Sequence, residues 1–242
     1  MRRPLVLLSW LLIPATISLV MAGARRQTAD YTGDFNIRAS DRLVATGGNE
    51  FYSLDPGTTS VLEGEDDGQQ VQVVTTVLAD TQVVRFSANG GRMTVHTRVV
   101  QEDEYINGEL VQVAYNHLAR CPRSGNIYQF GKSVYQYVNG TPVPSDESWI
   151  AGKRNARPGL RMPGTFLVGS RYYLEQAPGV SMDRAENMET GVTVRTPAGT
   201  FRNCVTVLES TPLEPDEEVI KIYAPGVGLI VDDQLVLVDY DG

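Results

Sequence analysis

Beyond residue 50 the chain is a series of short apolar runs, rich in Val, Thr and Tyr, separated by turn-forming pairs such as Asp67-Gly68 and Asn107-Gly108. Such runs between regularly spaced turns are typical of antiparallel β-strands. No segment after residue 24 shows the 3.6-residue period of an amphipathic helix. The pattern predicts an all-β fold, with residues 51–242 forming one domain of strongly curved antiparallel sheet, either an open barrel or a sandwich. The expected strands are residues 71–78, 81–87, 93–100, 110–118, 127–130, 134–138, 171–176, 192–195, 201–208, 219–223, 228–231 and 235–240.

The hairpin around Asn107-Gly108 can be predicted in more detail. Odd-numbered positions carry the apolar face in both flanking runs, residues 93–100 and 110–118. A two-residue turn would pair odd with even positions and mix the two faces, whereas a three-residue loop over residues 106–108 matches them. We therefore expect Val99 to lie opposite Tyr115, with Gly108 in a left-handed bulge position.

The first 24 residues have the three parts of a secretory signal peptide. Arg2 and Arg3 form a cationic start, residues 5–21 are apolar, and Ala22-Gly23-Ala24 offers a small-residue cleavage site. The sequence therefore predicts an exported protein, periplasmic or extracellular. An uncleaved N-terminal membrane anchor is the alternative, because the apolar run is close to the minimum of about 17 residues that spans a bilayer. No span is expected in the mature chain, and the polar residues 25–50 are expected to form a flexible lead.

The charge balance narrows the possible partners. The chain has 21 Lys and Arg against 29 Asp and Glu, which gives a formal net charge of −8. An acidic chain lacks the clustered cations that bind a phosphate backbone, so nucleic acid is not an expected partner. Two Cys and two His are too few for an ordinary Cys/His zinc site, and no motif indicates another metal or a cofactor.

A Gly- and Pro-rich stretch, residues 149–169, interrupts the series of strands and is expected to form a long irregular loop. It carries a local excess of cations: Lys153, Arg154, Arg157 and Arg161. One interpretation is a solvated loop whose cations balance nearby carboxylates, and the other is a site for an anionic ligand or partner. Aromatic residues are numerous in the neighbouring runs. Most should pack within the sheet, but Trp149 and Tyr172 are candidates for lining a ligand cleft.

The two cysteines, Cys121 and Cys204, would meet an oxidising compartment after export. The sequence therefore leaves undecided whether they form a disulfide, which requires their Cα atoms to come within about 7 Å. A nucleophilic Cys is less favoured, since the sequence places no His beside either residue. His117 falls on the apolar face of its run, where a hydrogen-bonded histidine near the core is expected.

Near the C-terminus, the segment Tyr223-Ala224-Pro225-Gly226-Val227-Gly228-Leu229 joins two expected strands. Pro225 restricts φ, and Gly226 and Gly228 permit a tight bend, so we expect a structural turn here.

This segment, together with residues 51–57, 105–110, 126–131 and 201–204, resembles a family of exported bacterial proteins of unknown function that are often predicted lipoproteins. The resemblance covers residues 51–237 and implies a single antiparallel β domain, such as an open barrel of the lipoprotein-carrier kind. It implies no activity. The chain differs from this family in two ways: it has no lipid-anchor Cys, and its second Cys is Cys121 where relatives often carry one near Thr97.

These observations favour a non-enzymatic exported β protein that binds an apolar ligand or a partner protein of the cell envelope. A hydrolase of an envelope or extracellular polymer, using two carboxylates as acid and base, is the first alternative. A structural surface component is the second.

Overall fold

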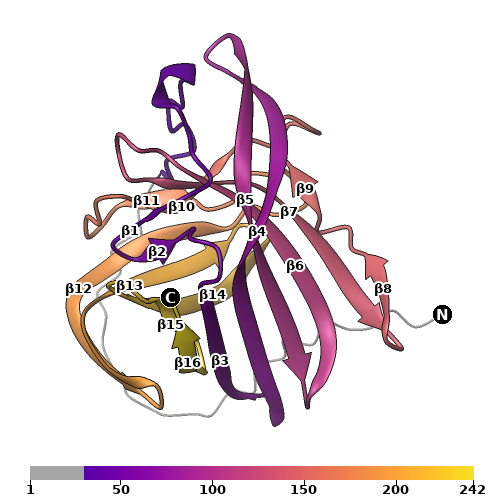
Figure 1. Ribbon diagram of the computed structural model, residues 1–242, viewed down its shortest axis with the longest axis vertical. Helices are drawn as coiled ribbons and strands as arrows, with labels where there is room; N and C mark the ends of the chain where they lie inside the picture. Colours follow the sequence, from indigo (N-terminus) through magenta and orange to yellow (C-terminus); the bar gives the residue numbers. More distant parts are fainter. Residues whose placement is uncertain (1–29) are drawn as a thin grey trace.

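The computed structural model describes residues 30–242, so the predicted signal peptide, residues 1–24, lies outside the described residues. The described chain is all-β, as the sequence predicts: 14 strands form one antiparallel sheet, and two more form a small separate sheet (Figure 1). The one short 3-10 turn is η1 (Ala39–Asp41). The strands are β1 (Gly48–Asn49), β2 (Tyr52–Ser53), β3 (Thr59–Asp66), β4 (Gln69–Ala88), β5 (Gly91–Ile106), β6 (Glu109–Arg120), β7 (Ile127–Val138), β8 (Thr141–Pro144), β9 (Trp149–Ile150), β10 (Gly159–Met162), β11 (Arg171–Tyr173), β12 (Arg184–Thr196), β13 (Gly199–Thr211), β14 (Glu214–Ala224), β15 (Gly228–Asp232) and β16 (Leu235–Asp241).

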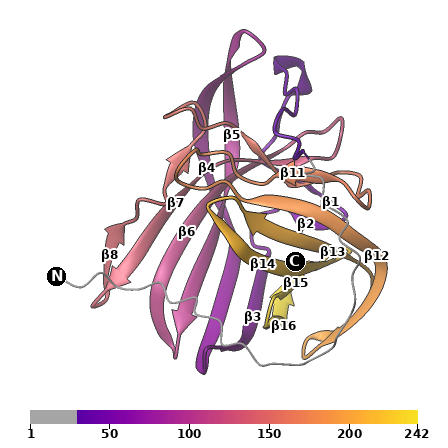
Figure 2. The same cartoon turned by 180° about the vertical axis from the view of Figure 1, so that it is seen from behind.

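The large sheet curls into an open barrel with the strand order β10-β7-β6-β5-β4-β3-β16-β15-β14-β13-β12-β11, and β8 and β9 pair with β7. Strands β3 to β7 run side by side along one wall, and β12 to β15 curl across the other (Figures 1 and 2). The two ends of the sheet are β10 and β11, and beside them Arg157 and Gln176 form an isolated bridge in which the Arg157 N–H donates to the Gln176 carbonyl at 2.9 Å. The main apolar core lies inside the curl and draws on both walls, with Val100 and Phe130 from one and Val205 and Tyr223 from the other.

Four hairpins of the sheet use the same two-residue turn, in which both residues have positive φ. The pairs are Asp67-Gly68, Asn89-Gly90, Asn107-Gly108 and Asn139-Gly140, with φ between 48° and 82°. Turns of this handedness match the twist of the strands they join, and Asn, Asp and Gly tolerate the left-handed region best. The turn residues therefore determine locally where β3, β4, β5 and β7 end.

The predicted three-residue loop at residues 106–108 is wrong. Ile106 pairs with Glu109 across a two-residue turn, and Val99 lies opposite His117 rather than Tyr115. An extra residue, Val111, is inserted between successive pairs of the ladder, so odd positions of β5 still face odd positions of β6 from there on. The requirement to keep both apolar faces together is thus met by a bulge inside the sheet and not by a longer loop.

Residues 71–78 and 81–87, expected as two strands, form the single strand β4 with a bulge between Val77 and Thr81. The buried side chain of Arg98 holds this bulge, since its Nη1 donates to the carbonyls of Leu78, Ala79 and Asp80 at 2.6–3.3 Å. A buried guanidinium must find acceptors, and the bulge supplies them.

Residues 30–50 are part of the folded unit and not a lead attached to it, which corrects the prediction for this segment. Val44 pairs with Arg120 of β6, and the buried Ile37 joins the main core. Asn89 at the β4–β5 tip donates to the Ile37 carbonyl at 2.7 Å. The sequence pattern missed this packing because an irregular segment has no period to reveal its buried side.

Cys121 and Cys204 are both buried and unbonded, so the disulfide that the sequence left open is absent. Cys121 packs in the main core, whereas Cys204 belongs to a second, smaller core with Leu62, Ile230 and Leu237. The two thiols therefore lie in separate packing environments.

The turn between β14 and β15 has Gly226 at φ 72° and Gly228 at φ 104°. Gly226 also donates its N–H to the Glu50 carbonyl at 2.8 Å, which ties the turn to the N-terminal segment. Within residues 30–242, no helix has the length and apolar character needed to cross a membrane.

His117 gives a prediction about pH. It is 6% exposed, and burial lowers its pKa from 6.5 to about 4. The unfolded chain takes up this proton below about pH 6.5 and the folded protein only near pH 4, so stability falls as the pH decreases through that range, by about 3 kcal/mol at most. The variant His117→Leu is expected to lose this contribution when urea unfolding is measured from pH 7 to 4.5.

The comparison must be made against the wild type at each pH, because Asp183 acts in the opposite direction. Burial and the charge of Glu175 raise the pKa of Asp183 to about 6, so protonation of Asp183 favours the folded state in the same range. A constant difference in stability between His117→Leu and wild type at all pH values would contradict the prediction.

Candidate functional site

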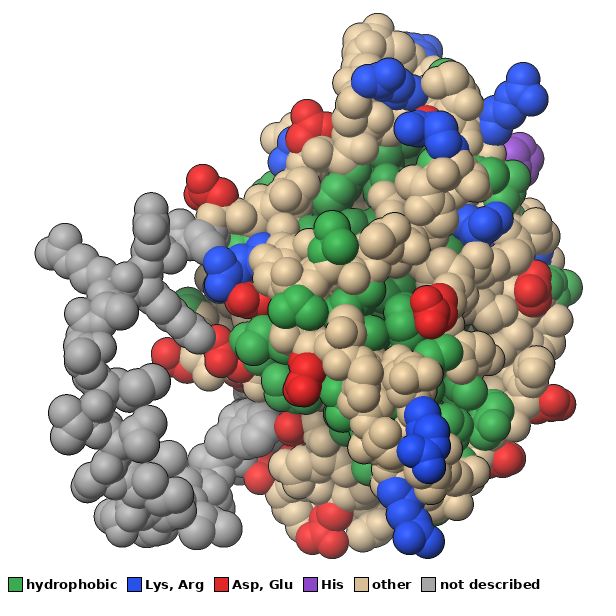
Figure 3. Space-filling view, turned by 90° about the vertical axis from the view of Figure 1, so that its left-hand side faces the viewer, with side chains coloured by type: hydrophobic (Ala, Val, Ile, Leu, Met, Phe, Trp, Pro, Cys, Tyr) green, Lys and Arg blue, Asp and Glu red, His purple; other side chains and the backbone are tan. Residues whose placement is uncertain are grey.

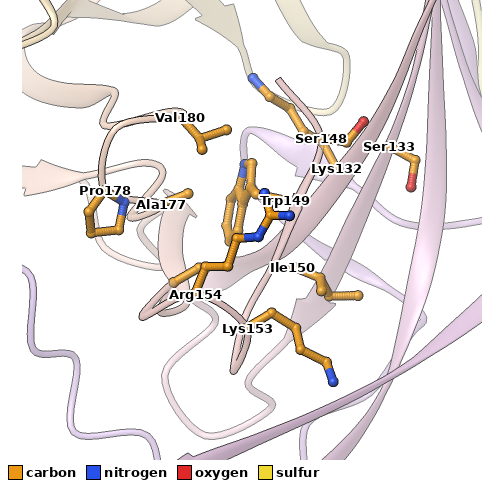
Figure 4. A pocket seen from close by; sticks show the side chains of 11 residues that line it. Lys132, Ser133, Ser148, Trp149, Ile150, Lys153, Arg154, Ala177, Pro178 and Val180 are labelled. Atoms are coloured by element: carbon orange, nitrogen blue, oxygen red, sulfur yellow. The ribbon is translucent and has the colours of Figure 1, made fainter. Parts of the chain in front are cut away.

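A pocket with a volume of about 370 Å³ is centred on Trp149. We call it the Trp149 pocket. Figure 4 shows Trp149 in the middle of the lining, with Ala177, Pro178 and Val180 on one side and Ile150 and Lys153 on the other. This lining is mainly apolar, and the volume falls in the range of about 300–1,000 Å³ that small-molecule sites have.

One wall of the pocket is the loop that follows β9. Its backbone is closed by hydrogen bonds from the Gly152 N–H to the Ala156 carbonyl and from the Ala156 N–H to the Lys153 carbonyl, at 2.9 and 2.8 Å. At Gly152, φ is 86°, and a Cβ there would meet the Arg85 carbonyl at 2.6 Å. The loop is thus held tightly against β4 and presents Lys153 and Arg154 outward.

The opposite wall is the turn over residues 177–181. The Ala177 N–H donates to the Ser181 carbonyl at 2.8 Å, and the N–H groups of Val180 and Ser181 both donate back to the Ala177 carbonyl. This tight turn places Pro178 and Val180 in the pocket lining, to one side of Trp149 (Figure 4). The walls come from segments that are far apart in the sequence, and β7 supplies the floor with Lys132 and Ser133.

Behind the pocket, the carboxylate of Glu175 is buried and contacts four polar or charged side chains. Its Oε2 accepts from Trp149 Nε1 at 2.8 Å and from Ser181 Oγ at 2.5 Å, and lies 3.1 Å from Lys132 Nζ. Its Oε1 accepts from Gln129 Nε2 at 3.0 Å. Glu175 therefore fixes the indole, the turn and the lysine in one arrangement.

Burial opposes ionisation of Glu175, but the charge of Lys132 and the hydrogen bonds from Ser181 and Trp149 outweigh it and hold the pKa of Glu175 below its ordinary value. Burial likewise opposes the charge of Lys132, and Glu175 with Asp183 keeps the pKa of Lys132 raised. Both members of the pair are thus charged at neutral pH, and the Glu175 carboxylate already accepts three side-chain hydrogen bonds beside its contact with Lys132.

Two further cations stand at the pocket without a partner in the described chain. Lys153 and Arg154 are exposed, and neither has a carboxylate within 4.0 Å among residues 30–242. Arg154 and its neighbour Asn155 both have positive φ, at 47° and 64°. The position of Arg154 is therefore set by the backbone conformation of the loop and not by an ion pair.

The residues predicted from the sequence as a site divide into three groups. Trp149, Lys153 and Arg154 line one pocket. Arg157 instead donates to Gln176 Oε1 at 3.0 Å, and the buried Tyr172 donates its hydroxyl to Asn187 Oδ1 at 3.0 Å.

Arg161 is the third case. The prediction of one irregular basic loop is wrong at this residue, because residues 159–162 form β10 and pair with β7. Arg161 is consequently turned into the barrel and lines a different pocket.

Sequence reasoning missed Lys132 and Glu175, which organise the pocket. A signal for Lys132 was present: it is the one charged residue of β7, whose other residues are apolar, aromatic or uncharged polar. Glu175 lies just beyond β11 and has no comparable signal, since its importance depends on four groups that the fold brings to it.

An exposed apolar surface is the second feature of interest. Leu167, Val168 and Met188 are 60%, 59% and 42% exposed. They are neighbours, because the Gly169 N–H donates to the Asn187 carbonyl at 2.8 Å. Figure 3, which views the molecule from the side of β12, shows apolar side chains gathered across the middle of this face. Exposed apolar surfaces of this kind are where proteins commonly pack against partners.

The two pockets are not lined by the pair of carboxylates that the two-carboxylate hydrolase hypothesis requires. The Trp149 pocket is lined by no Asp or Glu among residues 30–242, and the pocket at Arg161 has Glu102 as its one acidic lining residue. Across the same residues, no group of three His, Cys, Asp or Glu side chains is arranged to hold a metal ion.

Comparison with known proteins identifies no relative: no family model, no curated protein and no solved structure matches this chain. The family resemblance noted at Tyr223 to Leu229 therefore stays a prediction.

Proposed function

We propose that this protein is a non-enzymatic binding protein whose Trp149 pocket takes an apolar ligand that carries an anionic group. The observation that supports this most directly is an apolar pocket of about 370 Å³ with two unpaired cations, Lys153 and Arg154, beside it. In this proposal the protein acts after export, since residues 1–24 have the pattern of a signal peptide.

The apolar part of the ligand lies against the indole of Trp149 and the turn at Ala177 and Val180. Each buried CH2 of the ligand contributes about 0.8 kcal/mol, or about fourfold in affinity. The anionic end points to Lys153 and Arg154 at the opening. Lys132 cannot take this role, because Glu175 already neutralises it.

Dodecanoate is a suitable first probe, since it joins an alkyl chain to a carboxylate. We expect it to change the fluorescence of Trp149 in a saturable way, measured in a Trp10→Phe background where Trp149 is the sole tryptophan. Dodecanol, with the same chain and no charge, is expected to bind more weakly. Lengthening the fatty acid by one CH2 at a time should raise the affinity until the pocket is full.

The variant Arg154→Glu is expected to weaken dodecanoate binding about tenfold, because it replaces an attractive charge by a repulsive one at the opening. Its affinity for dodecanol should stay within about twofold of wild type. Arg202→Glu is the matched control: it makes the same change of charge on an exposed residue of β13 that does not line the pocket.

If Arg154→Glu lowered the affinity for dodecanoate and for dodecanol by the same factor, the proposal that the anionic group lies beside Arg154 would be contradicted. A lack of any saturable change with either probe in the Trp10→Phe protein would contradict the proposal as a whole.

A further inference from the structure

A second pocket opens inside the curl of the sheet, away from Trp149. Its volume is about 50 Å³, which is room for about three or four water molecules or a ligand group of that size. It lies between the wall formed by β3, β4 and β5 and the segments that carry Arg161, Tyr52 and Tyr223. None of its lining residues is shared with the Trp149 pocket. We call it the Arg161 pocket.

One side of the Arg161 pocket is a row of oxygen-bearing side chains across three neighbouring strands. Ser60 of β3 pairs with Thr75 of β4, and Thr75 pairs with Glu102 of β5. Residues that pair directly across a sheet point to the same face, so the two hydroxyls and the carboxylate stand side by side. No hydrogen bond within residues 30–242 occupies the side chains of these three residues.

Arg161 faces this row from β10. Its Nη2 lies 3.9 Å from Glu102 Oε1, which is close enough for an ion pair but too long for a hydrogen bond. Its guanidinium carbon is 5.9 Å from the centre of the Tyr52 ring. The side chain is only 15% exposed, and its hydrogen-bonding neighbour among the described residues is the Tyr52 phenol, which leaves most of its five N–H groups unused.

The guanidinium of Arg161 has unused donors, the carboxylate of Glu102 has unused acceptors, and the two are too far apart for a direct hydrogen bond. A hydroxyl group placed between them can form a hydrogen bond with each. A hydroxyl accepts a hydrogen bond from Arg161 and donates its own proton to Glu102. A second hydroxyl on the next carbon reaches the row at Thr75 and Ser60. Burial raises the pKa of Tyr52 and of Tyr223, so both phenols stay neutral and can also donate and accept.

We propose that the Arg161 pocket binds the adjacent hydroxyl groups of a polyol, with Arg161 and Glu102 bridged by one hydroxyl. Neither an apolar group nor a lone anion satisfies both charges, since the anion would meet Glu102. The size of the pocket limits the bound part to about two adjacent carbons with their hydroxyl groups. That part can be one end of glycerol or one edge of a sugar ring.

The test is a titration of the full chain labelled at tyrosine rings with carbon-13 and followed by NMR. Glycerol and methyl glucopyranoside are the two probes, and 1,3-propanediol, which has no adjacent hydroxyls, is the control compound. We expect at least one probe to shift the ring signals of Tyr52 and Tyr223 in a saturable way, and 1,3-propanediol to leave them unchanged. The probe that binds more tightly distinguishes a free polyol from a sugar edge.

The variant Glu102→Gln is expected to weaken the binding of that probe at least tenfold. Glu104→Gln is the matched control, because Glu104 lies two residues further along the same face of β5 and outside the pocket. Equal weakening in both variants, or in neither, would overturn the assignment. So would equal shifts with 1,3-propanediol and the polyols in the wild-type protein, a comparison that does not depend on any variant folding.

Discussion

Replacing Glu175 by Leu is expected to lower the free energy of unfolding by about 4 kcal/mol. The substitution leaves the charge of Lys132 buried without its partner and removes the acceptor of Trp149 Nε1, Ser181 Oγ and Gln129 Nε2. An unmatched buried charge costs far more than a lost surface ion pair, because water cannot reach it. Urea unfolding of the full chain measures the loss as a lower midpoint at unchanged slope.

Two further variants separate the charge effect from simple loss of a side chain. Glu186→Leu removes the partner of Arg171 in a pair on β11 and β12 that is partly open to solvent, and should cost about 1 kcal/mol or less. The double variant Glu175→Leu/Lys132→Met should recover part of the stability lost in Glu175→Leu. A double variant that is less stable than Glu175→Leu would show that the unpaired lysine is not the cause.

Replacing Gly159 by Ala is expected to lower the free energy of unfolding by about 4 kcal/mol, because the added methyl group would collide with backbone atoms. A Cβ on Gly159 would overlap the carbonyl of Leu174 and come within 2.9 Å of the Glu175 nitrogen. Both neighbours are backbone atoms, so no side chain can rotate away and β10 must separate from the segment that carries Glu175. The loss is measured as a decrease in the midpoint temperature of the main thermal unfolding transition.

Gly91→Ala is the matched control for this substitution. Gly91 begins β5 in a conformation open to any residue, and the nearest atom to its added Cβ is 3.9 Å away. It should change the melting temperature by no more than a few degrees. If Gly159→Ala melted within a few degrees of wild type, the close approach at Leu174 would not be required for the fold. Because the displaced strand adjoins Glu175, Gly159→Ala should also weaken dodecanoate binding at the Trp149 pocket.

The hairpin at Asn107-Gly108 shows how far local patterns reach in this chain. The turn residues and the alternation of apolar positions were both informative, and they disagreed by one residue. Alternation predicted a three-residue loop, whereas the left-handed conformations of Asn107 and Gly108 produce a two-residue turn. The bulge at Val111 reconciles them, and nothing in the local sequence distinguishes that solution from a longer loop, because the cost of a bulge depends on the neighbouring strand.

The same limit applies to the site. The excess of cations at residues 153–161 was visible, but their separation into two pockets was not. Arg161 and Arg154 are seven positions apart, and a short pairing of residues 159–162 with β7 turns Arg161 inward while Arg154 stays on an exposed loop. Pairing across the sheet, and not the composition of the segment, decides the direction of each side chain.

Composition and periodicity alone were sufficient for the all-β class, the antiparallel curved sheet and the position of most turns, because these depend on residues that are neighbours in the chain. The tertiary structure decided everything that depends on distant segments meeting. The buried carboxylate of Glu175 joins β7, β9 and the turn at Ser181. The Arg161 pocket likewise needs β3, β4, β5 and β10 to curl around a common interior. Charges and hydroxyls that read as isolated along the chain acquire partners only when the sheet closes toward itself, and burial then makes those partners obligatory.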